Sequence, residues 1–98
     1  MRELSIPPDA REARQATEVL RGWLIDDKLQ CTLLPGIWKD QYESWGILLA
    51  DAAHHVADAL ADSGQGPRPV IMARIVKALL RELSEPTDQH TGDFVPRQ

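Results

Sequence analysis

Residues 17–36 read "TEVLRGWLIDDKLQCTLLPG", and this stretch decides the fold because it has the pattern of a β-hairpin. Two runs rich in leucine, β-branched and aromatic residues flank Asp26 and Asp27, and a Pro-Gly pair closes the second run. A two-residue loop at the aspartates gives one wholly apolar face. Its cross-strand pairs are Leu24 with Leu29, Gly22 with Cys31, and Leu20 with Leu33.

The opposite face of this predicted hairpin is mixed in character. It holds Val19, Arg21, Trp23, Gln30 and Thr32. A three-residue loop that includes Lys28 would instead place Trp23 beside Cys31 and Arg21 beside Leu33, which mixes apolar and polar side chains on both faces. We therefore predict the two-residue loop.

Two helices are predicted after the hairpin. Asp40, followed three residues later by Glu43, resembles a helix-capping arrangement, and Gly64 is a natural stop. The first helix has an apolar stripe at Trp45, Leu48, Leu49, Ala52, Val56, Ala59 and Leu60. The second begins near Pro69 and stops before Pro86, and its predicted buried face is Met72, Ile75, Val76, Leu79, Leu80 and Leu83.

These elements predict an α+β fold, in which an antiparallel β-hairpin packs on two antiparallel helices in the order β-β-α-α. Leu4-Ser5-Ile6 or Phe94-Val95 is long enough to add a short extra strand from a terminus. We expect residues 1–16 to be a loosely ordered arm, 17–86 a single folded domain and 87–98 a flexible tail.

Composition narrows the function classes for this chain. The 98 residues hold 11 basic and 15 acidic side chains, and the net charge of -4 argues against a nucleic-acid partner. A single cysteine excludes an internal disulfide and a Cys-rich metal site. The sequence shows neither a signal peptide nor a membrane span, so we expect a cytoplasmic protein with no membrane partner.

The histidine pair in residues 50–62, "ADAAHHVADALAD", is the first place to look for a metal. Adjacent residues on a helix point about 100° apart, so His54 and His55 are wrongly spaced to ligate one ion. Four-residue spacing instead favours surface pairs of Asp51 with His55 and of His54 with Asp58. We therefore predict no metal site, and these two histidines are only weak candidates for one.

Other reactive or charged groups have simpler structural explanations. Cys31 lies among leucines in the predicted hairpin, where a thiol behaves as a small apolar side chain. Arg74, Lys77 and Arg81 form a basic ridge on the second helix, as the polar side of an amphipathic helix does. No catalytic constellation or cofactor motif remains, so the sequence favours a protein that is not an enzyme and predicts no cofactor.

Trp23 lies on the hairpin face that the predicted helices do not cover. A two-stranded sheet with open edges needs a cover, which the N-terminal arm, the C-terminal tail or another molecule can supply. The predicted interaction surface is Val19, Arg21, Trp23 and Ile25. A homodimer is favoured, because docking a loose terminus costs chain entropy.

Several short motifs, in their order along the chain, resemble the sequences of a known protein family. These are "IPPDA", "EVLRGWL", "LLPGIW", "WGILLADAAHHVADAL" and "PTD", and they run from Ile6 to Asp88. The family is the short bacterial proteins of domain of unknown function 5076. The resemblance implies a bacterial cytoplasmic protein, and it carries no activity, cofactor or catalytic residue.

Together these observations predict a small protein-interaction or regulatory module that self-associates, with a further protein partner as an open option. The alternative is a small-molecule-binding protein or enzyme. It would use a pocket between hairpin and helices near Cys31, Trp38 and Trp45. A polar-lined pocket in a monomer favours this alternative, whereas a flat apolar patch on a two-fold axis favours the first function.

Overall fold

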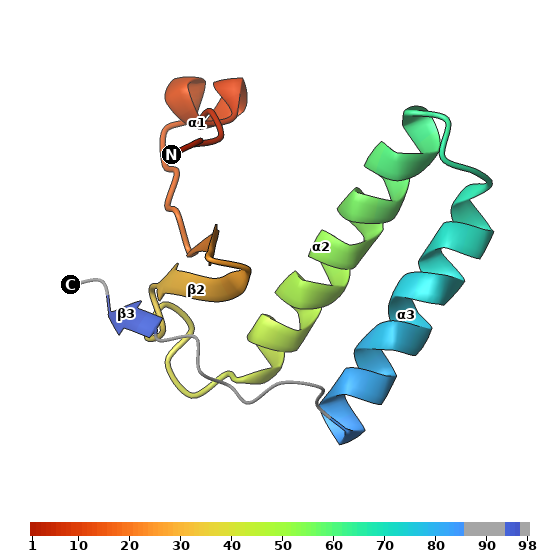
Figure 1. Ribbon diagram of the computed structural model, residues 1–98. Helices are drawn as coiled ribbons and strands as arrows, with labels where there is room; N and C mark the ends of the chain where they lie inside the picture. Colours follow the sequence, from red (N-terminus) through yellow and green to blue (C-terminus); the bar gives the residue numbers. More distant parts are fainter. Residues whose placement is uncertain (86–93, 97–98) are drawn as a thin grey trace. The chain divides into compact units, whose positions relative to one another are not determined.

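The computed structural model describes residues 1–85 and 94–96, and it confirms the α+β order of a β-hairpin followed by two long helices (Figure 1). In chain order the elements are α1 (Pro8–Glu12), β1 (Leu20–Ile25), β2 (Lys28–Leu33), α2 (Glu43–Asp62), α3 (Arg68–Ser84) and β3 (Phe94–Pro96). None of the helices in the described ranges has the length and apolar character needed to cross a membrane.

The turn between β1 and β2 consists of Asp26 and Asp27, which both have positive φ angles, of 52° and 67°. Two consecutive residues with positive φ form the type I′ turn, whose twist matches that of the flanking strands. The cross-strand partners are those of the two-residue loop: Leu24 with Leu29, Gly22 with Cys31, and Leu20 with Leu33. The predicted register is therefore confirmed, and the three-residue loop is excluded.

The two faces of the hairpin differ in exposure. On the apolar face Leu24 is 77% and Leu29 is 55% exposed, whereas Arg21 and Trp23 on the other face are half-buried. The Leu29 side chain lies close to Gly22, where an added Cβ would be 3.3 Å from Leu29 Cδ1. Glycine at position 22 thus lets Leu29 lie close against the neighbouring strand.

A third strand comes from the C-terminal end of the chain. β3 pairs in parallel with β2, with Cys31 opposite Phe94, and the sheet order is β1-β2-β3. The extra strand that the sequence allowed is thus formed by the tail. The flexibility predicted for residues 87–98 concerns mainly residues outside the described ranges.

The start of α2 corrects one expectation. The residue before the helix is Tyr42, and no side chain caps the helix, so the predicted Asp40 cap is wrong. A tight turn precedes the helix instead, in which the Gln41 amide donates to the Trp38 carbonyl at 2.9 Å. The end is as predicted, because Gly64 follows the last turn with a φ of 84°.

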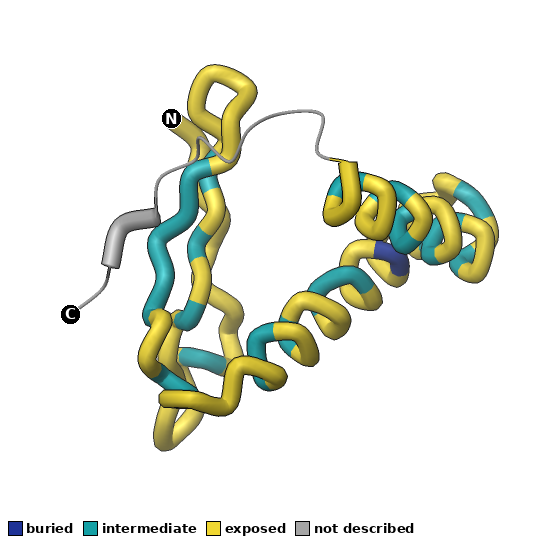
Figure 2. The backbone as a smooth tube through the Cα atoms, turned by 90° about the horizontal axis from the view of Figure 1, so that it is seen from below, coloured by how far each residue is buried: buried dark blue, intermediate teal, exposed yellow. Residues whose placement is uncertain are grey.

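α2 and α3 pack side by side as a helical hairpin (Figure 1). Ala57 on α2 is the one buried residue in the described part of the chain, and most other positions are exposed or intermediate (Figure 2). The predicted apolar faces are present but incompletely covered: in α3, Ile75 is half-buried, whereas Leu80 and Leu83 are 60% and 71% exposed.

The chain divides into two compact units. One contains the residues up to Ile37 together with β3, and the other begins at Trp38 and contains both long helices. Within the predicted N-terminal arm the structure has one short helix, α1, with no buried residue. The packing of the hairpin on the helices, the looseness of the arm and the domain limits 17–86 stay predictions.

Candidate functional site

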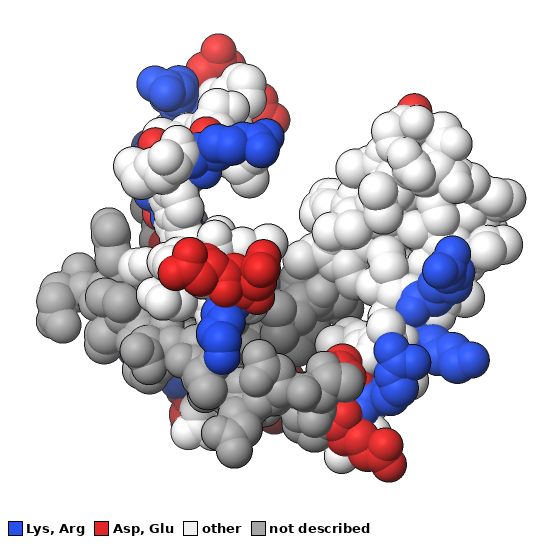
Figure 3. Space-filling model, viewed as in Figure 1, with Lys and Arg blue, Asp and Glu red and all other residues white. Residues whose placement is uncertain are grey.

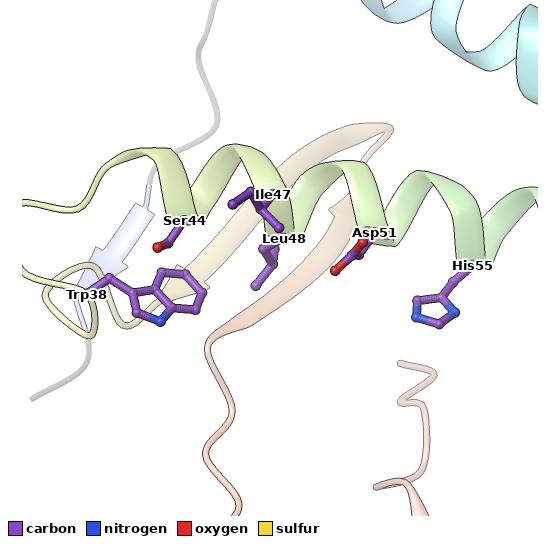
Figure 4. A pocket seen from close by; sticks show the side chains of 7 residues that line it. Trp38, Ser44, Ile47, Leu48, Asp51 and His55 are labelled. Carbon is purple, nitrogen blue, oxygen red and sulfur yellow. The ribbon is translucent and has the colours of Figure 1, made fainter.

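α2 carries an open groove of about 500 Å³, and all of its lining belongs to the helical unit. The lining residues are Trp38, Ser44, Ile47, Leu48, Asp51, Ala52 and His55. Those on α2 recur at spacings of three and four, which places them along one side of the helix. Trp38 comes from the turn before the helix and lies at one end of the row (Figure 4).

The groove lies on the side of α2 that is turned away from α3. The buried Ala57 marks the side that contacts α3. At about 100° per residue, Leu48 and His55 lie roughly 160–180° round the helix from Ala57. Figure 4 agrees with this placement, because Leu48, Asp51 and His55 point away from α3. The packing of the two helices therefore leaves the groove open.

Trp38, which lines the groove, is held by a contact with a second tryptophan, Trp45. The rings of Trp38 and Trp45 are 5.0 Å apart at an interplanar angle of 77°, an edge-to-face contact. Such pairs stabilise by about 0.5–1.5 kcal/mol beyond their buried area, which fixes the Trp38 ring beside the first turn of α2. Of the predicted pocket residues, the structure thus brings Trp38 and Trp45 together, whereas Cys31 belongs to β2 in the other unit.

The rim of the groove is polar. Ser44 is half-buried, and Asp51 and His55, one helical turn apart, are exposed. A hydroxyl, a carboxylate and an imidazole above an apolar floor suit hydrogen-bonding or cationic groups at the edge of an apolar ligand or side chain. In residues 1–85, no three His, Cys, Asp or Glu side chains come together as metal ligands.

The other polar cluster of the helical unit centres on Arg68. Its Nε donates to Asp58, and its Nη2 lies 2.8 Å from Nδ1 of His54. The hydrogen bond from Arg68 lowers the pKa of Asp58 below its usual 3.8, and the positive charges of Arg68, His55 and His54 act in the same direction. Arg68 therefore ties the start of α3 to α2.

The sequence predicted a direct pair of His54 with Asp58, and the structure places the Arg68 guanidinium against both side chains instead. Arg68 was missed because it belongs to the next helix, where spacing rules within one helix give no signal. Ser44 and Ile47 were also missed as site residues. The spacing of three from Ser44 to Ile47 and of four from Ile47 to Asp51 is visible in the sequence, but the neighbouring apolar stripe gave the stronger signal.

The predicted interaction surface on β1 is partly covered from within its own unit. Of its four residues, Val19, Arg21 and Trp23 are half-buried and Ile25 is 44% exposed. Arg21 bonds to Glu3 at 2.9 Å and to Glu18 at 3.1 Å. The N-terminal residues line a crevice with this part of β1. The proposed binding role of this surface stays a prediction.

Comparisons with known proteins give a family and a solved relative. Residues 3–87 match the family model "Domain of unknown function (DUF5076)", which confirms the resemblance seen in the sequence. A solved structure described as that of a "putative pyruvate dehydrogenase from the photosynthetic bacterium Rhodopseudomonas palustrus CGA009" is 32% identical, with a TM-score of 0.70. The match covers 100% of this chain and 96% of that chain. No curated protein matches the chain.

Proposed function

The chain belongs to the DUF5076 family, and we propose that it is a protein-interaction module that self-associates in the bacterial cytoplasm. The exposure of aliphatic side chains on the two long helices carries this proposal. Eight of them are between 38% and 71% exposed, while Ala57 is the only buried residue in the described ranges. The eight are Ile47, Leu49, Val56, Leu60, Val70, Leu79, Leu80 and Leu83.

The free energy available from covering these side chains is large. Their exposed fractions together equal about four whole side chains, and burying one aliphatic side chain is worth about 1.5–3 kcal/mol. Complete burial would therefore stabilise each chain by about 6–12 kcal/mol. Association costs about 4–15 kcal/mol in lost freedom, a cost that two chains share. Burial of all eight side chains in both chains of a dimer would supply about 12–24 kcal/mol, which exceeds most of that cost.

The sheet supports the same proposal. β1 is an edge strand of the described sheet, and Leu24 within it is 77% exposed. An open edge strand pairs readily with a strand of another chain. The surface formed by Val19, Arg21, Trp23 and Ile25 is thus a second place for a protein partner, in addition to the helices.

Sedimentation equilibrium tests the proposal directly. We expect the apparent mass to rise from 11.0 kDa towards twice that value as the concentration increases from about 1 to about 100 µM. The rise should follow mass action for a single dimerisation step. A mass that stays at 11.0 kDa throughout contradicts self-association.

Small-molecule binding is the second candidate, and the groove on α2 favours it. Its volume of about 500 Å³ falls within the usual range for ligand pockets, and an apolar floor with a polar rim is typical of them. The description of the similar solved structure as a putative pyruvate dehydrogenase identifies no substrate for this groove. This function needs the groove free in solution, so a monomer that binds an apolar dye there, and loses the dye on Ile47→Glu, would favour it over self-association.

A further inference from the structure

The hydrogen-bond pattern of the hairpin shows which backbone groups of β1 point to its outer edge. The Leu34 amide donates to the Val19 carbonyl at 3.1 Å, and these two residues continue the register of the hairpin as an opposed pair. Hydrogen-bonded pairs alternate with non-hydrogen-bonded pairs along an antiparallel ladder, so every second residue after Val19 also directs its backbone groups to β2. The residues between them direct their backbone groups to the outer edge. They are Leu20, Gly22 and Leu24.

This edge has no strand partner within the described residues. β1 is the outer strand of the sheet, and no backbone hydrogen bond within residues 1–85 and 94–96 reaches Leu20, Gly22 or Leu24 from the outer side. The N-terminal residues from Arg2 to Pro7 line a crevice of about 270 Å³ with this part of β1, and they do not pair with it as a strand. The edge thus presents a row of unpaired donors and acceptors.

β1 lacks the features that protect an edge strand from pairing with another chain. Protected edges usually carry lysines, a proline or a bulge. The ladder to β2 is regular from Leu20 to Ile25, and the one charged residue of β1, Arg21, is bonded to Glu3 and Glu18. By contrast, a group of basic side chains lies over α3, in the other unit (Figure 3). The edge of β1 is therefore open to pairing.

We infer that the chain dimerises through β1, which pairs antiparallel with β1 of a second copy about a two-fold axis at Gly22. The inference rests on the self-association proposed above and names its surface. The two described sheets then become one sheet, in the order β3-β2-β1-β1-β2-β3. Because each copy contributes the same edge, the contact is closed and does not propagate into fibres.

The backbone groups select this register. Antiparallel strands bond only where residues with outward groups oppose each other, and this also keeps the apolar faces of both copies on one side of the sheet. With Gly22 opposite Gly22 of the partner subunit, Leu20 lies opposite Leu24 of the partner subunit, so every outward residue of β1 is paired. A shift by two residues would place Leu20 opposite Asp26, or Leu24 opposite Glu18, and both of these partners lie outside β1.

The side chains agree with this register. On the apolar face, the pair of Leu20 and Leu24 covers two leucines that are 37% and 77% exposed in the single chain. On the other face, Arg21 lies opposite Trp23 of the partner subunit, where a guanidinium over an indole ring is a favourable cation–π arrangement. The two-fold axis forms each of these pairs twice. The β1 sequence is thus complementary to itself, which favours a second copy as the occupant.

The paired segment is short because like charges stand at its ends. Beyond Leu20, Glu18 would approach Asp26 of the partner subunit, and two opposed carboxylates do not favour further pairing. Asp26 also begins the turn, where its positive φ of 52° leaves the extended conformation. We therefore expect pairing from Leu20 to Leu24.

A matched pair of variants at Leu24 tests the edge. Proline and valine have the same number of side-chain carbon atoms, but only proline removes the outward N–H, a group that makes no bond to β2. That N–H occurs once in each copy, so a dimer loses it twice. We expect Leu24→Pro to raise the dimer Kd in sedimentation equilibrium at least about 10-fold more than Leu24→Val does. Far-UV circular dichroism at the same concentrations checks that both variants stay folded.

Disulfide cross-linking tests the register. In a Cys31→Ser background, chains with Leu20→Cys are mixed with chains with Leu24→Cys and then oxidised. Residues of an opposed, hydrogen-bonded pair have Cα atoms about 5.5 Å apart, which suits a disulfide, whereas position 20 of one copy and position 20 of the other would be about 14 Å apart. On a non-reducing gel we expect a covalent dimer from the mixture and only background levels from either variant alone.

Three results would contradict the inference. Equal Kd values for Leu24→Pro and Leu24→Val overturn it and leave self-association standing, and so does a mixture that cross-links no more than either variant alone. If Leu24→Pro does not fold, the cross-linking decides. If the unmodified chain is a monomer at every concentration, both the inference and the proposed function fail.

Discussion

Ala57 offers the most direct test of the helix packing. It has no exposed surface, whereas Ala59, two residues later on the same helix, is exposed. Replacing each in turn by leucine adds the same three carbon atoms at nearly the same helix propensity. Only at position 57 do the added atoms meet the packed contact between α2 and α3, so the difference between the two variants isolates that contact.

The expected magnitude follows from overpacking. Inserting extra carbon atoms into a packed contact costs about 1–3 kcal/mol, because side chains leave their preferred rotamers or the backbone shifts. An exposed Ala59→Leu should change the free energy of unfolding by less than about 0.5 kcal/mol. For a chain of this size each kcal/mol corresponds to about 4–8 °C in Tm, so Ala57→Leu should melt at least about 4 °C lower than Ala59→Leu.

Thermal and urea denaturation followed by far-UV circular dichroism measure this difference. Both variants must be compared at one protein concentration, because the proposed self-association would make Tm depend on concentration. Equal melting temperatures for Ala57→Leu and Ala59→Leu would show that Ala57 is not packed in solution. In that case the side of α2 assigned to α3 is wrong.

Two further predictions concern the turn and the bridge. Asp26→Asn combined with Asp27→Gly should stabilise the hairpin by about 0.5–1 kcal/mol, because Asn-Gly suits the two positive φ angles better; a lower urea midpoint would argue against the type I′ turn. Arg68→Gln should raise the pKa of Asp58 towards 3.8, as measured by carboxyl NMR titration. Because the folded pKa is lowered, the bridge stabilises the fold above about pH 4 and this contribution is lost as pH falls through the folded value; an unchanged pKa would mean that the bridge is absent.

The hairpin could be predicted in detail because its determinants are local. A two-residue loop at Asp26 and Asp27 fixes every later pair, and a shift by one residue would exchange the two faces. The termination of α2 at Gly64 is similarly local, since glycine adopts the left-handed conformation without strain. The sequence predicted the third strand only as one of two options, because Leu4-Ser5-Ile6 and Phe94-Val95 are both long enough to form it.

The site could be predicted only in part, because it depends on which neighbour each helix side meets. Trp38 and Trp45 were expected in a pocket from their positions around the start of the helix. The Arg68 bridge joins two different helices. The predicted Asp40 cap is wrong because residues Trp38–Gln41 form a turn, so the helix begins later than the capping pattern indicates. Neither outcome is encoded in the spacing of residues within one helix.

The main ambiguity in the sequence is that α2 is apolar on more than one side. Ala57 marks the side that meets α3, the groove residues lie nearly opposite, and Leu49, Val56 and Leu60 form a third stripe. A surface helix with one neighbour needs a single apolar stripe, so α2 has the composition of a helix with several neighbours. α2 therefore keeps apolar surface beyond its contact with α3, and self-association requires such surface.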